Sequence, residues 1–127
     1  MGKRILIVER DSEIASGVEF LLRREGHDIE VALTAADAME RIEHFAPELI
    51  FIESCLPDLS GFDLCRKLRT AITGRQPYIL LLSSGGNQQD VVRSKEVGAD
   101  DYVPLPLVTL DFLARLRSRL EATSAAA

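Results

Sequence analysis

The sequence has few of the residues that build several common kinds of site. Its only two cysteines, Cys55 and Cys65, match neither a Cys-x-x-Cys metal or redox motif nor a disulfide framework, and no histidine pair accompanies them. We expect free thiols in a reducing cytoplasm. Lysine and arginine number 15 against 20 acidic residues, which gives a net charge of −5. Because clustered Lys and Arg hold nucleic-acid phosphates, this deficit argues against a nucleic-acid-binding surface.

Long apolar runs are also missing from the sequence. The run at residues 5–8 is too short for a signal-peptide core, and no stretch approaches the length needed to cross a membrane. We therefore expect a cytoplasmic protein without membrane contact. The chain has 127 residues, of which 46% are hydrophobic, so it is long enough to bury one core. We predict one domain over residues 1–123, and a linker or tail at residues 124–127.

Short apolar runs without alternation are the clearest pattern that is present. They lie at residues 5–8, 49–52 and 78–82. Such runs are typical of strands buried on both faces of a parallel sheet, although a short buried helix shows the same pattern. Ile29, Val31 and Leu33 alternate with polar residues and predict an edge strand. A short fifth strand is predicted within residues 98–106.

Helical periodicity fills the intervals between these runs. We predict helix caps at Asp11 or Ser12 and at Thr34. The inward faces of the first and third helices are predicted to be Ile14, Val18, Leu21 and Leu22, and Phe62, Cys65 and Leu68 or Arg69. The fourth helix, at about residues 88–97, has few apolar residues and should be the most loosely held. Five strands that alternate with five helices predict a doubly wound α/β fold with a parallel sheet.

Polar side chains follow three of the predicted strands. Glu9 and Arg10 follow the first, Glu53 follows the central strand at residues 49–52, and Ser83 follows the fourth. Open α/β sheets bind ligands outside the carboxyl ends of their strands. Glu53 is therefore the candidate functional residue, although a charged residue that only marks the exit of a strand to water is the commoner case.

Four stretches together resemble the receiver domain of bacterial two-component response regulators. They are residues 5–11 (ILIVERD), 53–62 (ESCLPDLSGF), 79–84 (ILLLSS) and 98–106 (GADDYVPLP). They occur in order and cover nearly the whole chain. The resemblance implies a flavodoxin-like fold with strand order 2-1-3-4-5. It also implies that an aspartate at the position of Glu53 accepts a phosphoryl group from a histidine kinase.

The same resemblance implies roles for other positions. In the family an acidic pair at the positions of Glu9 and Arg10 holds magnesium. A serine or threonine at Ser83 and a lysine at Leu105 bind the phosphoryl oxygens, and an aromatic residue at Tyr102 responds to the change. The resemblance further implies a cis peptide bond before Pro106. Pro104 departs from the family pattern, and we expect a trans bond before it.

This sequence departs from the family pattern at three of its five chemical positions. Arg10 removes a Mg²⁺ ligand and brings a positive charge toward the place of the ion. Glu53 is one methylene longer than aspartate, which moves the nucleophile by about 1 Å and can cost ~10²-fold in rate. Leu105 offers no charge to a transferred phosphoryl group. Together the three departures indicate a pseudo-receiver.

The sequence thus predicts a signalling module that is not an enzyme, needs no cofactor and acts through protein contacts without phosphorylation. Its partners would be a histidine kinase, an output domain or another signalling protein. A Glu53 side chain that mimics a phosphorylated aspartate, and a fold kept only for docking, both fit this prediction.

Two alternatives stay open. The first is a phosphoacceptor that uses Glu53 with Mg²⁺, for which the ligands would be Glu9, Glu53 and the backbone of Cys55. The second is a small-anion or nucleotide-binding module in which the turn at residues 83–87 cradles the anion, although the sequence has no Walker-type motif.

Two contacts are also predicted. Arg10 could bridge Glu9 and Glu53, because a guanidinium forks onto carboxylates, or it could point into water. In many receivers the fourth helix, fifth strand and fifth helix pair with a second copy. The residues predicted for such a homodimer are Arg93, Lys95, Glu96, Asp100, Asp101, Arg115 and Arg119.

Overall fold

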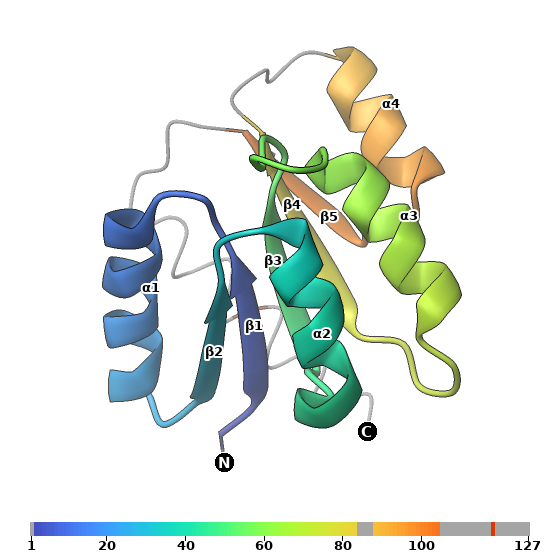
Figure 1. Ribbon diagram of the computed structural model, residues 1–127. Helices are drawn as coiled ribbons and strands as arrows, with labels where there is room; N and C mark the ends of the chain where they lie inside the picture. The colour runs from blue at the N-terminus through green and yellow to red at the C-terminus, as the bar shows by residue number, and fades with distance from the viewer. Residues whose placement is uncertain (1, 84–87, 105–117, 119–127) are drawn as a thin grey trace.

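A parallel five-stranded sheet forms the centre of the protein (Figure 1). The computed structural model describes residues 2–83, 88–104 and 118. The strands are β1 (Arg4–Val8), β2 (Asp28–Ala32), β3 (Leu49–Glu53), β4 (Tyr78–Ser83) and β5 (Asp101–Pro104). Their order is β2-β1-β3-β4-β5, which confirms the order that the sequence predicted.

Helices cover both faces of this sheet. They are α1 (Ser12–Arg24), α2 (Ala35–Phe45), α3 (Gly61–Ala71) and α4 (Gln88–Glu96). Figure 1 shows α1 on one face and α2 and α3 on the other, with α4 beside α3. The predicted last helix lies outside the described residues apart from residue 118, as do Leu105, Pro106 and residues 124–127.

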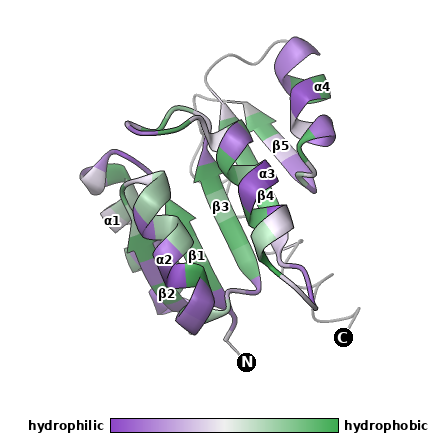
Figure 2. Cartoon of the chain, turned by 45° about the vertical axis from the view of Figure 1, so that its right-hand side comes forward, coloured by the Kyte–Doolittle hydropathy of each residue, from purple (hydrophilic) through white to green (hydrophobic). Residues whose placement is uncertain are grey.

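The two sides of each inner strand face two different clusters of the core. Ile5 and Ile7 of β1 pack with Ala15 and Leu22 of α1, whereas Leu6 packs with residues of α2 and α3. All three β1 residues are fully buried. Figure 2 accordingly shows green, hydrophobic strands between helices that carry purple, hydrophilic residues. Burial on both faces explains why the apolar runs do not alternate, and each buried Leu or Ile side chain contributes about 1.5–3 kcal/mol.

Side-chain caps begin the helices where the sequence predicted them. Asp11 Oδ1 accepts hydrogen bonds from the backbone N–H groups of Glu13 at 2.9 Å and Ile14 at 3.3 Å. Thr34 Oγ1 accepts from the N–H of Asp37 at 3.0 Å. These bonds satisfy donors that the first turn of a helix leaves free. Asp11 is therefore a helix cap.

Two predicted apolar positions were wrong. Leu33 lies beyond the end of β2 and is 41% exposed, while Ala32 is buried in its place. Ile14 is 50% exposed, because α1 turns Ala15 and Leu22 toward the sheet and Ile14 lies about 100° around the helix from Ala15. The weak apolar character predicted for the fourth helix is confirmed, since Ser94 is the only buried residue of α4.

Candidate functional site

The candidate site lies where β1, β3 and β4 end at the same edge of the sheet. Val8 pairs with Ile52, and Glu53 pairs with Leu82, so that Glu9, Glu53 and Ser83 follow one another across three neighbouring strands. The backbone N–H of Glu9 continues the sheet by donating to Ala32 O at 3.0 Å. Parallel strands thus bring together residues that are up to 74 positions apart.

Glu9 and Glu53 form a carboxyl pair at this edge. Glu9 is only 5% exposed, whereas Glu53 is partly buried. Burial, a side-chain hydrogen bond with Glu53 and the charges of Glu53 and Asp11 raise the pKa of Glu9 from 4.5 to about 8. Glu9 is therefore mostly protonated at neutral pH and serves as the donor to Glu53. The second carboxyl oxygen of Glu9, Oε2, is buried without a hydrogen-bond partner.

The predicted bridge from the Arg10 guanidinium to both carboxyl groups is wrong. No ion pair joins Arg10 to Glu9 or Glu53, all three of which are described. The Arg10 side chain is exposed, and its Nη1 lies 3.6 Å from Sγ of Cys55. The backbone N–H of Arg10, in contrast, donates to Glu53 Oε2 at 3.3 Å. The main chain of Arg10 reaches the site, whereas its long side chain is exposed.

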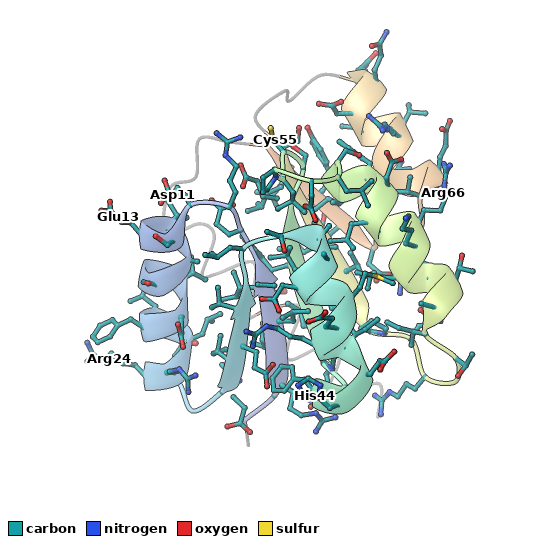
Figure 3. All side chains as sticks on the ribbon, in the orientation of Figure 1. Asp11, Glu13, Arg24, His44, Cys55 and Arg66 are labelled. Carbon is teal, nitrogen blue, oxygen red and sulfur yellow. The ribbon has the colours of Figure 1, made fainter. Side chains whose placement is uncertain are left out.

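The loop after Glu53 folds back on the end of β3. The N–H of Ser54 donates to Leu82 O at 2.7 Å, and the N–H of Gly61 donates to Ser54 O at 2.8 Å. Cys55 and Ser60 form a short antiparallel bridge across the loop. Figure 3 shows the exposed Cys55 on this loop, at the same edge of the molecule as Asp11 and Glu13 at the start of α1. The loop therefore fixes the backbone at Glu53.

Gly61 permits the closest approach in this loop. A Cβ atom at this position would collide with the carbonyl oxygen of Glu53 and would lie 2.8 Å from Cα of Ser54. Only glycine lets the first residue of α3 approach the end of β3 this closely. The start of α3 is thus packed directly against the backbone of Glu53.

Asp58 is a contributor to this edge that sequence reasoning missed. Its Oδ1 and Oδ2 accept hydrogen bonds from the N–H groups of Ala35 at 2.9 Å and Ala36 at 3.0 Å. These bonds lower the pKa of Asp58 and join the loop after β3 to the start of α2. Asp58 is more than 20 positions from its partners in the sequence. The only signal in the sequence was its acidic side chain, which is favourable at a helix N-terminus.

Ser83 and Tyr102 lie on the β4 and β5 side of the site. Ser83 is 3% exposed, and its Oγ donates to Oδ2 of Asp90 in α4 at 3.0 Å. Tyr102 pairs with Leu81 in the sheet and packs its partly buried ring against the core. The Ser83 hydroxyl thus links the site edge to α4.

Several residues predicted for a homodimer interface have partners within the chain. The Arg93 guanidinium lies 4.5 Å from the centroid of the Phe62 ring and 3.6 Å from Asp63 Oδ1. Asp100 Oδ2 accepts from Arg69 at 2.7 Å and from the N–H of Ile79 at 2.8 Å.

The remaining interface candidates are less constrained. Lys95 and Glu96 are exposed on α4, and Asp101 is partly buried and accepts from the N–H of Tyr102. Arg115 and Arg119 lie outside the described residues. The homodimer stays a prediction.

The donor set at the site does not fit an octahedral Mg²⁺ ion. Of the two carboxyl groups, Glu9 is buried and already hydrogen-bonded to Glu53. Arg10, which follows Glu9, supplies no carboxylate ligand. Across residues 2–83 and 88–104, no group of three His, Cys, Asp or Glu residues is arranged to hold a metal ion. The orphaned Glu9 Oε2 alone does not supply the near-ideal oxygen geometry that Mg²⁺ requires.

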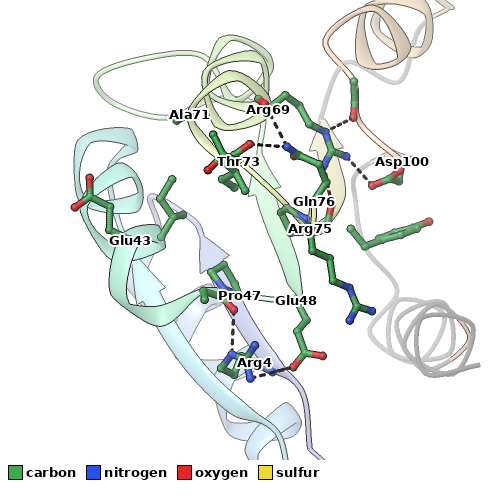
Figure 4. A pocket seen from close by; sticks show the side chains of 16 residues that line it. Arg4, Glu43, Pro47, Glu48, Arg69, Ala71, Thr73, Arg75, Gln76 and Asp100 are labelled. Atoms are coloured by element: carbon green, nitrogen blue, oxygen red, sulfur yellow. Dashed lines mark hydrogen bonds and ion pairs between the residues drawn. The ribbon is translucent and has the colours of Figure 1, made fainter. Parts of the chain in front are cut away.

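A groove of about 860 Å³ lies at the opposite end of the sheet, beside the amino ends of the strands (Figure 4). Its main charged groups neutralise one another. Arg4 pairs with Glu48 at 3.5 Å, and Arg69 pairs with Asp100 at 2.7 Å. Arg69 also donates to the carbonyl oxygens of Gly98 and Pro77. These contacts join neighbouring loops, so we assign this end a structural role.

The two cysteines differ in accessibility. Cys55 and Cys65 are both free, as the sequence predicted. Cys65 is buried in α3, and burial raises the pKa of its thiol to about 11. Its Sγ lies 3.4 Å from the carbonyl oxygen of Val97, so Cys65 is a core residue.

Among the described residues, no helix has the length and apolar character to span a membrane.

Comparison with known proteins is consistent with this geometry. Residues 5–117 match the response regulator receiver domain family. A CheY-like response regulator receiver domain protein from Methanospirillum hungatei is 28% identical, with both chains fully covered and a TM-score of 0.89. The BeF3-activated receiver domain of RstA from Klebsiella pneumoniae is 32% identical, with 90% of this chain and 95% of that chain covered and a TM-score of 0.79. The BeF3-activated receiver domain of Thermotoga maritima DrrB is 30% identical, with 95% and 99% covered and a TM-score of 0.83.

Proposed function

Because the chain belongs to the response regulator receiver domain family, we propose that it transmits signals through protein contacts without accepting a phosphoryl group at Glu53. Receiver domains in general are signalling modules that contact kinases and output domains. The more specific part of the proposal concerns metal binding and phosphorylation at Glu53. Here the module works in the cytoplasm, holds no Mg²⁺, and is not switched by phosphotransfer.

The contact between Glu9 and Glu53 carries this proposal. Phosphoryl transfer to a carboxylate depends on cations that offset the charge of the phosphoryl oxygens and on accurate positioning of the nucleophile. Glu53 instead interacts with a protonated Glu9 and with the N–H of Arg10 at 3.3 Å. The Arg10 guanidinium lies against Cys55 and forms no ion pair with Glu53.

Incubation with a small acyl phosphate and Mg²⁺ is the direct test. We expect no phosphorylated product of the wild-type chain by intact-mass spectrometry, and no increase in melting temperature with Mg²⁺. The variant Glu53→Asp alone is expected to stay unlabelled, because Arg10 and the missing lysine still deprive the site of a metal and a phosphate ligand. Labelling of the wild-type chain at Glu53 would establish the phosphoacceptor alternative instead.

A combined variant provides the positive control. Arg10→Asp, Glu53→Asp and Leu105→Lys together restore the acidic pair, the shorter nucleophile and the lysine of the family pattern. We expect this variant to bind Mg²⁺ and to be labelled by the acyl phosphate. If it folds but stays unlabelled, the three departures are not what prevents phosphotransfer.

We further propose that the exposed face of α4 contributes to self-association. Lys95 and Glu96 are exposed there with opposite charges, which suits reciprocal pairing between two copies. Since exposed pairs contribute only about 0–1 kcal/mol each, the dimer should be weak and should dissociate as salt is raised. Sedimentation velocity at low and high salt tests this. Purely monomeric protein at high concentration and low salt, unchanged by Lys95→Glu, would show that this domain does not use the face.

A further inference from the structure

Within the part of the chain that the structure describes, helix α4 buries few of its own side chains. Ser94 is its only buried residue, and Val92 is 54% exposed. Arg93 reaches α3 through the Phe62 ring at 4.5 Å. Asp90, in the first turn of α4, accepts a hydrogen bond from Ser83 Oγ at 3.0 Å. A helix with so little apolar contact depends on such bonds for its position.

The bond between Ser83 and Asp90 has features of a strong contact. Ser83 is 3% exposed, so its hydroxyl is shielded from competing water. At 3.0 Å the bond is at the long end of the range for O–H···O hydrogen bonds, but a low local dielectric strengthens it. A carboxylate in the first turn of a helix is also favoured by the helix dipole. Asp90 is thus suited to hold the hydroxyl and its own helix at once.

The same bond connects α4 to the backbone of Glu53. Ser83 follows Leu82, which pairs with Glu53 in the sheet. The carbonyl oxygen of Leu82 also accepts from the N–H of Ser54 at 2.7 Å. Only one residue of β4 therefore separates the loop after Glu53 from the hydroxyl that holds α4.

We propose that Asp90 is a positioning residue that serves as an internal anionic partner for Ser83, and that their bond holds α4 in place without an anion supplied from outside. This inference rests on the proposed function and adds a mechanism to it. The Ser83 hydroxyl lies at the site edge and bonds directly to α4. In this chain the Ser83 hydroxyl donates its hydrogen bond to the Asp90 carboxylate of α4. A contact within the domain therefore holds α4 in its position.

Hydrogen exchange of the α4 amides tests the proposal on the full chain. We expect Ser83→Ala and Asp90→Asn each to speed exchange of the α4 amides by about tenfold, because each removes the link between helix and sheet. The double variant should exchange no faster than the faster single variant, since both changes break one bond. Ser83→Thr retains the hydroxyl and should restore protection. Glu96→Gln, on the exposed face of the same helix, should leave exchange unchanged.

The outcomes separate this inference from the proposed function. Unchanged exchange of α4 in Ser83→Ala and Asp90→Asn, or effects of the two changes that simply add, would overturn the role of the bond. Acyl phosphate with Mg²⁺ is then added to the wild-type chain. Labelling of Glu53 would overturn the proposed function, while the result for the two variants would still decide whether Asp90 holds α4. A thermal melt of each variant shows whether a faster exchange is confined to α4 or reports loss of the whole fold.

Discussion

The free energy of unfolding is expected to fall as pH rises from about 4.5 to about 8, because burial and Glu53 raise the pKa of Glu9 over this interval. Below the lower value Glu9 is protonated in both states, and its contribution to stability is fully present. Above it, the unfolded state loses a proton that the folded state keeps, so folding becomes less favourable with each step in pH. Above pH 8 Glu9 is ionised in both states, and the loss is complete.

The size of this effect follows from the interval between the two pKa values of Glu9. A difference of one pKa unit corresponds to about 1.4 kcal/mol, so the interval from 4.5 to about 8 sets an upper limit of about 5 kcal/mol. Glu53 and Asp11 face Glu9 with like charge, and the N–H of Arg10 favours its ionised form. His27, whose burial lowers its pKa, gives an opposite slope near neutral pH. The difference between wild type and a Glu9 variant is therefore the quantity to measure.

Urea denaturation between pH 5 and pH 8.5 supplies that difference. Glu9→Gln keeps the size of the side chain and a donor for Glu53 but cannot ionise. We expect it to be close to wild type at pH 5 and more stable than wild type by ~2–4 kcal/mol at pH 8.5. Glu40→Gln, at an exposed position of α2, is the matched control and should follow the wild-type profile. Parallel profiles for wild type and Glu9→Gln would show that Glu9 is not held protonated.

Replacement of Gly61 by alanine is expected to destabilise the domain by about 2–3 kcal/mol. The new Cβ would collide with the carbonyl oxygen of Glu53, and this contact is with backbone, which cannot move aside as a flexible side chain can. The start of α3 or the end of β3 must shift, and either movement disturbs the bond between Gly61 N and Ser54 O.

Gly17 provides a matched control within the same chain. It lies in the middle of α1, where an added Cβ would meet no atom within 4 Å. Gly17→Ala should therefore stabilise the domain by about 0.5–1 kcal/mol, since alanine is the better helix former. Urea denaturation of both variants at one pH measures the contrast. If Gly61→Ala were as stable as wild type, the close packing of α3 against Glu53 would be disproved.

The sequence by itself determined the strands and much of the fold. The unalternating runs at residues 5–8, 49–52 and 78–82 require burial on both faces, and this requirement is local enough to be seen in the order of residues. The caps Asp11 and Thr34 were predictable for the same reason, because a cap contacts backbone only two or three residues away. The three departures from the family pattern were likewise visible as residue types.

Only the tertiary structure decided how the side chains at the strand ends pair. Arg10 has the charge to bridge Glu9 and Glu53, but its main chain faces Glu53 while its guanidinium reaches Cys55. Asp58 accepts hydrogen bonds from the start of α2, and the bonded residues are more than 20 positions apart in the sequence. These outcomes depend on burial, backbone direction and the distance between separate loops, which residue spacing does not encode. The protonation of Glu9 has the same origin, because its pKa is raised first by burial and then by a carboxyl group from a neighbouring strand.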